Sequence, residues 1–226
     1  MCFSAAASLT AGAGLLVIGA ITLRQAHSRA EMPFAAIPVL FGIQQLLEGA
    51  LWLTFSETAP QSRFVLTHAY SFFSHVLWPI YVPLAVLCLE SEIWRRKVLV
   101  GISLAGGVVG LYLLYFLIKL PIVAEVQGRH IVYISSHFYI LAVMLLYILG
   151  TCISSIYSIH GWVRVFGIVS FLSFVAAAAF YEKWFISVWC FFAALLSSIV
   201  LMFFLDRQNS PSLVSSRMTK LRQNYG

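Results

Sequence analysis

The amino-acid sequence predicts an all-α membrane protein, built as a bundle of seven transmembrane helices. The 226-residue chain is 61% hydrophobic and only 10% charged, and its mean hydropathy is +0.92. A soluble domain of this length needs far more charge to cover its surface. Apolar runs of about 20 residues, the length that crosses a bilayer as a helix, follow one another along the chain.

These apolar runs account for nearly all of the sequence, so we expect no soluble domain beside them. Their apolar residues are continuous rather than alternating, which is typical of membrane helices and not of a β-barrel. They predict one transmembrane domain over residues 1–206 and a polar, basic, Ser-rich cytoplasmic tail over residues 207–226. The predicted spans are 4–23, 33–55, 66–89, 98–118, 131–152, 161–181 and 184–205.

The distribution of lysine and arginine predicts the orientation of this bundle. Of the 14 basic residues, ten lie in the tail and in the loops after the first, third and fifth spans. Because cytoplasmic loops carry the excess of positive charge, we expect the N-terminus outside and the C-terminus in the cytoplasm. The four on the other side are Arg63, Lys119, Arg129 and Lys183.

The same charges argue against one class of partner. The pI of about 9.3 follows from the topology, and no basic patch is interleaved with base-stacking aromatic residues. We therefore expect no nucleic acid as a partner. The expected partners are the lipid bilayer and a small molecule or lipid.

Two histidine pairs with the same spacing are the clearest functional signal. "HAYSFFSH" runs from His68 to His75, and "HIVYISSH" runs from His130 to His137. Both lie at the outer ends of spans that are expected to run inward. Seven residues is close to two helical turns, so the two members of a pair share a helix face but lie roughly 10 Å apart. A metal ion would therefore need one histidine from each helix.

Glu48 is the only acidic residue expected at real membrane depth. An anion there costs several kcal/mol, so the carboxyl group must be protonated, paired, or turned toward water or a metal ion. Its expected depth, roughly 10 Å below the outer surface, cannot be separated from the depths of His75 and His137. We therefore predict that Glu48, His75 and His137 bind Zn or Cu in a pocket that opens outward. The residues expected to line the pocket are Cys2, Gln44, Gln45, Trp52, His68, Ser71, His130 and Cys190.

These residues support two functional hypotheses. A metal ion bound by two imidazoles and one carboxylate, with a vacant fourth position, would support hydrolysis of a lipid-like substrate. Alternatively, the protein is a non-enzymatic transporter, sensor or assembly factor that uses the cluster to bind protons or a small ligand. Two further readings stay open: a neutral Glu48 that only holds helices together, and a single b-type haem between His75 and His137.

Four segments resemble a known but uncharacterised family. "MCFSAAASLTAG", "PFAAIPVLFGIQQLLEGALW", "HVLWPIYVPLAVLCLE" and "SVWCFFAALLS" look like small bacterial integral membrane proteins that begin Met-Cys-Phe-Ser. This likeness spans nearly the whole chain. It implies a multi-pass protein of a bacterial inner membrane and no particular activity.

A more distant architectural similarity points to zinc chemistry. Seven spans with an outer N-terminus, an intramembrane acid and several histidines are similar to the alkaline ceramidase and adiponectin-receptor superfamily of zinc hydrolases. Those enzymes place an HxxxH pair in the last span, whereas residues 184–205 contain no histidine and the acid here is Glu48. The similarity implies only that such a cluster can hold a metal ion.

Overall fold

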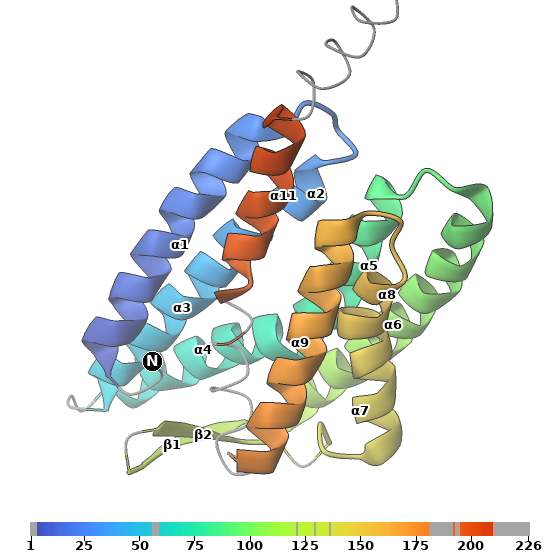
Figure 1. The fold of residues 1–226 in the computed structure, drawn as a ribbon. Coiled ribbons are helices and arrows are strands. Elements are labelled where there is room, and N and C mark those ends of the chain that lie inside the picture. The colour runs from blue at the N-terminus through green and yellow to red at the C-terminus, as the bar shows by residue number, and fades with distance from the viewer. Residues whose placement is uncertain are drawn as a thin grey trace, which may run out of the picture.

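A computed structural model describes residues 4–55, 59–120, 122–128, 130–135, 137–180, 192 and 195–209. Within these residues the chain is helical apart from one β-hairpin, as Figure 1 shows. Five helices are long and apolar enough to cross a membrane, which confirms the helical membrane class. They are Ala5–Gln25, Met32–Thr54, Pro60–Leu89, Ile93–Lys119 and Gly161–Ala179.

The first two crossings pack closely because small residues face each other. Helix α1 (Ala5–Gln25) is joined by the short helix α2 (Met32–Ala35) to helix α3 (Ile37–Thr54), which runs back alongside α1 (Figure 1). A Cβ atom added to Gly12 would lie 3.0 Å from the Gly42 carbonyl oxygen. The two backbones therefore touch at this point, the contact that small residues allow in membrane helices.

The next crossing contains a π-helical turn, and that turn carries His75. Helix α4 (Pro60–Ser71) continues through η1 (Phe72–Leu77) into α5 (Trp78–Leu89). Pro79 has no N–H, so a regular α-helix would leave the His75 carbonyl without its usual partner. A π-helical turn satisfies such a carbonyl with an N–H one residue further along, and it frequently marks a functional site.

Helix α6 (Ile93–Lys119) leads into the hairpin at the lower end of the bundle in Figure 1. Strands β1 (Val123–Gln127) and β2 (His130–Ile134) pair antiparallel, and Gly128 between them has a φ of 67°. The structure differs here from the predicted span 131–152, because residues 130–134 form a strand. The β-branched run in β2 finds a partner in β1, so it is stabilised by a ladder rather than by a helix.

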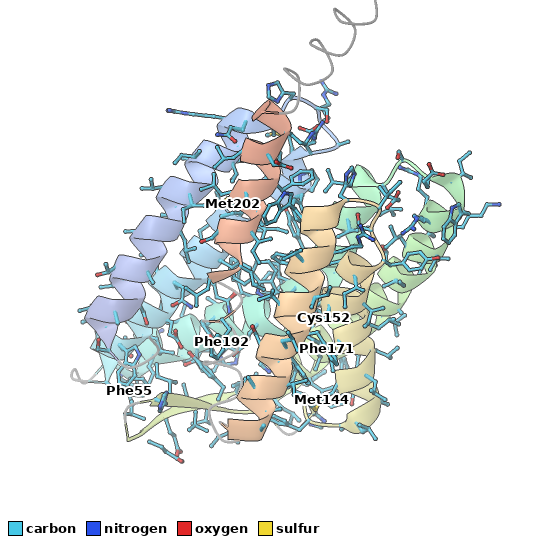
Figure 2. The ribbon with its side chains drawn as sticks, viewed as in Figure 1. Phe55, Met144, Cys152, Phe171, Phe192 and Met202 are labelled. Atoms are coloured by element: carbon cyan, nitrogen blue, oxygen red, sulfur yellow. The ribbon has the colours of Figure 1, made fainter. Side chains whose placement is uncertain are left out.

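The following helix is correspondingly short. Helix α7 (Leu141–Ile148), the π-helical turn η2 (Leu149–Ile153) and α8 (Ser154–Ile156) form one apolar stretch of helix. Cys152 of η2, labelled in Figure 2, is buried, and its thiol donates to Ser170 Oγ of helix α9 (Gly161–Phe180) at 3.7 Å.

Two more helices complete the described chain. Helix α9 (Gly161–Phe180) packs on η2 and α8, and α11 (Ser197–Asn209) returns beside α1. They correspond to the predicted span 161–181 and to the end of the predicted span 184–205. The start of that last span lies outside the described residues.

The tightest junction in the fold fixes α5 against α6 and η2. A Cβ atom on Gly106 would overlap the Pro79 carbonyl oxygen, and one on Gly150 would lie 2.9 Å from the same atom. Pro83 has no N–H, so it leaves the Pro79 carbonyl without its helical hydrogen bond, and this oxygen faces the two glycines instead. The junction holds η1, and with it His75, against α6.

An ion pair closes the opposite end of the bundle. Arg207 of α11 lies 2.7 Å from Glu31, which also accepts a hydrogen bond from the His27 N–H at 2.9 Å. Burial works to raise the pKa of Glu31, but the His27 N–H and the Arg207 guanidinium outweigh it and lower that pKa. The pair ties the C-terminal helix to the connection between α1 and α2.

Candidate functional site

A cavity of about 190 Å³ lies between η1, α6 and the segments that flank β2. Its walls are mainly apolar, and its polar groups come from two histidines and one serine. His75 and His137, two of the three predicted metal ligands, thus share one cavity. The lining residues are His75, Leu113, Phe116, Leu117, Leu120, Ile122, Ile134, Ser135 and His137.

His75 is held in a fixed orientation by its own helix. The residue is only 1% exposed to solvent. The Ser74 hydroxyl lies 3.3 Å from the Ser71 carbonyl oxygen and 2.8 Å from Nδ1 of His75. We assign its proton to the carbonyl, which can only accept, so that Nδ1 carries the ring proton and Nε2 of the neutral imidazole keeps a lone pair.

Nε2 of His75 is the atom that a ligand can reach. It is buried and makes no hydrogen bond within the described residues. A buried acceptor without a partner costs about 1–3 kcal/mol, so a ligand or water in the cavity would recover that free energy.

His137 reaches the cavity from a turn and not from a helix. Residues 137–139 follow β2 and precede α7. The His137 ring stacks on Phe116 of α6, with ring centroids 3.7 Å apart and an interplanar angle of 15°. The next residue, Phe138, packs against the His75 ring at 4.7 Å. The turn therefore covers the cavity on the side of the hairpin.

Glu48 does not line this cavity, although it is completely buried. It lies on the face of α3 that also carries Gln44, whose Oε1 accepts a hydrogen bond from Trp78 Nε1 at 2.7 Å. Within the described residues, no three His, Cys, Asp or Glu side chains gather closely enough to hold a metal ion. The predicted trio of Glu48, His75 and His137 is therefore not assembled in this structure.

Several other polar residues on the neighbouring faces are buried. Gln45 is 1% exposed, and neither its Oε1 nor its Nε2 makes a hydrogen bond within the described residues. The same holds for Trp52 Nε1 and Ser71 Oγ. These three residues were predicted to line the pocket, but none of them lines the cavity: Gln45 and Ser71 are buried elsewhere in the bundle, and Trp52 is half-buried.

The outer members of the two histidine pairs occupy different positions. Nδ1 of His68 lies 2.8 Å from the Phe64 carbonyl and its ring packs on Phe64, so its own helix satisfies it. His130 is in β2, opposite Gln127, and burial lowers its pKa. Neither residue lines the cavity. Cys2 and Cys190 lie outside the described residues.

Sequence reasoning missed the apolar walls of the site, which come from the end of α6 and from the hairpin. Phe116 and Leu117 lie in the last turn of α6, Leu120 and Ile122 lie between α6 and β1, and Ile134 is the last residue of β2. A usable signal was present, because a glycine turn between two β-rich runs, as in "VAEVQGRHIVYI", is typical of a hairpin.

The chain matches one protein family over residues 1–216, described as a family of unknown function (DUF6629). Among curated proteins and among solved structures, nothing matches the chain. The family match agrees with the resemblance to uncharacterised membrane proteins. None of the comparisons links the chain to the ceramidase and adiponectin-receptor superfamily.

Proposed function

The chain belongs to the DUF6629 family, whose function is unknown, so a function has to be inferred from the chain's own residues. We propose that the protein binds a small molecule in the cavity lined by His75 and His137. The observation that carries this proposal is Nε2 of His75, a buried acceptor with no hydrogen bond within the described residues, in the cavity wall. The volume of about 190 Å³ suits a small ligand, since an engineered 150 Å³ apolar cavity binds benzene.

We further propose that the chain crosses a bacterial inner membrane seven times, with the N-terminus outside and the C-terminus in the cytoplasm. The alternating directions of the helices in Figure 1 support this topology. The start of α6 carries Arg95, Arg96 and Lys97, which the positive-inside rule assigns to the cytoplasm. The hairpin and the cavity, at the other end of α6, would then face outward.

We rank binding without catalysis, as in a transporter, sensor or assembly factor, above metal-dependent hydrolysis. Catalytic zinc sites use three protein ligands, and the cavity offers two imidazoles. One observation keeps a zinc or copper site as a second candidate: Nδ1 of His75 is engaged by Ser74, and metal-ligating histidines typically donate their other N–H in this way.

A cavity-filling substitution tests the proposal. Leu117→Trp places a large ring in the cavity wall, whereas Leu104→Trp adds the same ring to the exposed side of the same helix, where Leu104 is 67% exposed. We expect fluorinated small molecules, followed by ¹⁹F NMR on the purified protein, to bind the wild type and Leu104→Trp but not Leu117→Trp. Equal binding by both variants, or no binding by the wild type, would contradict the proposal.

Metal binding is measured on the same samples. The second candidate predicts one equivalent of Zn²⁺ or Cu⁺ per chain in the wild type, and its loss in His75→Ala and His137→Ala. His68→Ala is the matched control, because its ring lies outside the cavity. Stoichiometric metal that survives both cavity substitutions would exclude this site as its location.

A further inference from the structure

We propose that the cavity selects a neutral, ring-sized molecule that carries a hydroxyl group, a phenol-like ligand whose O–H donates to Nε2 of His75. This inference rests on the proposed function, since it names the chemical class of ligand that the cavity would take.

The lining residues exclude a charged ligand. Among the described residues, the nine that line the cavity include no lysine, arginine, aspartate or glutamate. Six of them are Leu, Ile or Phe, so a charged group would lose its hydration without gaining a counter-ion. The cavity therefore favours a neutral molecule.

The state of the His75 ring decides which polar group the ligand must carry. In the assigned tautomer, in which Ser74 Oγ accepts the Nδ1 proton, Nε2 of the neutral ring can only accept. Phe138 packs against the same ring at 4.7 Å and limits its rotation. A hydroxyl can donate to this nitrogen, whereas an ether or ester oxygen would face it lone pair to lone pair.

The aromatic lining and the size of the cavity favour a ring over an extended chain. The rings of Phe116 and His137, which stack on each other, both line the cavity. A volume of about 190 Å³ leaves room for one six-membered ring and a small substituent, given that benzene fills an engineered cavity of about 150 Å³. Aromatic rings pack on such surfaces with offset or edge-to-face geometry.

The expected selectivity follows from the unpaired acceptor. Leaving a buried acceptor without a donor costs about 1–3 kcal/mol, which corresponds to a factor of about 5–150 in affinity. A site that hydrogen-bonds a hydroxyl discriminates strongly against an analogue that lacks it.

Two fluorinated probes that differ only by a methyl group on the oxygen test this inference. 4-Fluorophenol carries the hydroxyl, and 4-fluoroanisole replaces its hydrogen with a methyl group. We expect ¹⁹F NMR titration of the purified wild type to give at least tenfold tighter binding of the phenol. His75→Phe keeps a ring of similar size and should reduce that preference to about one, while His68→Phe should leave it unchanged.

The outcomes separate this inference from the proposed function. Equal affinity of the wild type for both probes, or a preference that survives His75→Phe, would overturn the hydroxyl selectivity while the cavity remains a binding site. If neither probe binds, the phenol-like ligand is excluded, and the comparison of Leu117→Trp with Leu104→Trp decides the broader proposal with other probes.

A second variant covers the case in which His75→Phe does not fold. Ser74→Ala removes the oxygen that holds the Nδ1 proton, so the ring can place its proton on Nε2 instead. We expect the preference for 4-fluorophenol to fall in this variant, with the affinity for 4-fluoroanisole little changed. A preference as strong as in the wild type would contradict the assigned role of Nε2.

Discussion

Replacing Gly106 with alanine should weaken the junction that holds His75 against α6. The added methyl group would overlap the Pro79 carbonyl oxygen and lie 3.1 Å from the Pro79 carbonyl carbon, so the obstacle is backbone that cannot rotate away. Overpacking of this kind costs about 1–3 kcal/mol. Alanine returns about 1 kcal/mol through its higher helix propensity, which leaves a net loss of up to about 2 kcal/mol.

Gly107→Ala is the matched control, because a Cβ atom there meets nothing within 4 Å. Its stability should be unchanged or slightly raised, since only the propensity gain applies. The free energies of unfolding can be compared in mixed micelles with a rising fraction of denaturing detergent. If Gly106→Ala proved as stable as Gly107→Ala, the close contact of Pro79 with α6 would be refuted.

Two further comparisons test the polar interior and the ion pair. Gln45→Met removes a buried amide without hydrogen bonds in the described residues and should keep or raise the melting temperature, whereas Gln44→Met deprives Trp78 Nε1 of its acceptor and should cost about 1–3 kcal/mol. The reverse order would show that Gln45 has a partner. Arg207→Gln should lower stability at pH 7 by up to about 1 kcal/mol, because Arg207 is half exposed and screened. The pKa of Glu31 is lowered in the folded protein, so its ionised carboxylate stabilises the fold above the usual carboxyl pKa of 4.5. The difference in the free energy of unfolding between the wild type and Arg207→Gln should therefore shrink as the pH falls below that value. A difference that stays constant with pH would contradict the pairing.

The membrane class could be predicted from the sequence because it depends on composition and on the length of apolar runs. These quantities need no knowledge of packing. The run from His130 to Ile134 is different, since its four apolar residues, three of them β-branched, can extend a helix or form a strand with equal hydropathy. The partner strand Val123–Gln127 decides that these residues form a strand and not a helix. A count of membrane spans based on hydropathy does not detect that pairing.

The candidate site could be predicted only in part, because the sequence gives the depth of a residue along its helix but not the direction of its side chain. Depth along a helix axis placed Glu48, His75 and His137 at one level, but depth says nothing about the direction in which a side chain points. Glu48 lies on the α3 face shared with Gln44, away from the cavity wall. His137 shares the cavity with His75 because the turn after β2 brings it to α6, and helical depth played no part in that.

The central claim, that the turn after β2 closes the cavity of His75 against α6, is tested most directly by cross-linking. In a background with the native cysteines replaced by alanine, Phe116→Cys combined with His137→Cys should react with a short dithiol-specific cross-linker, since these rings stack at 3.7 Å. Ile118→Cys with His137→Cys is the control, because Ile118 is 73% exposed on α6 and does not line the cavity. The structure predicts efficient cross-linking of the first pair and little of the second. Equal yields, or a higher yield for the second pair, would contradict this placement of His137.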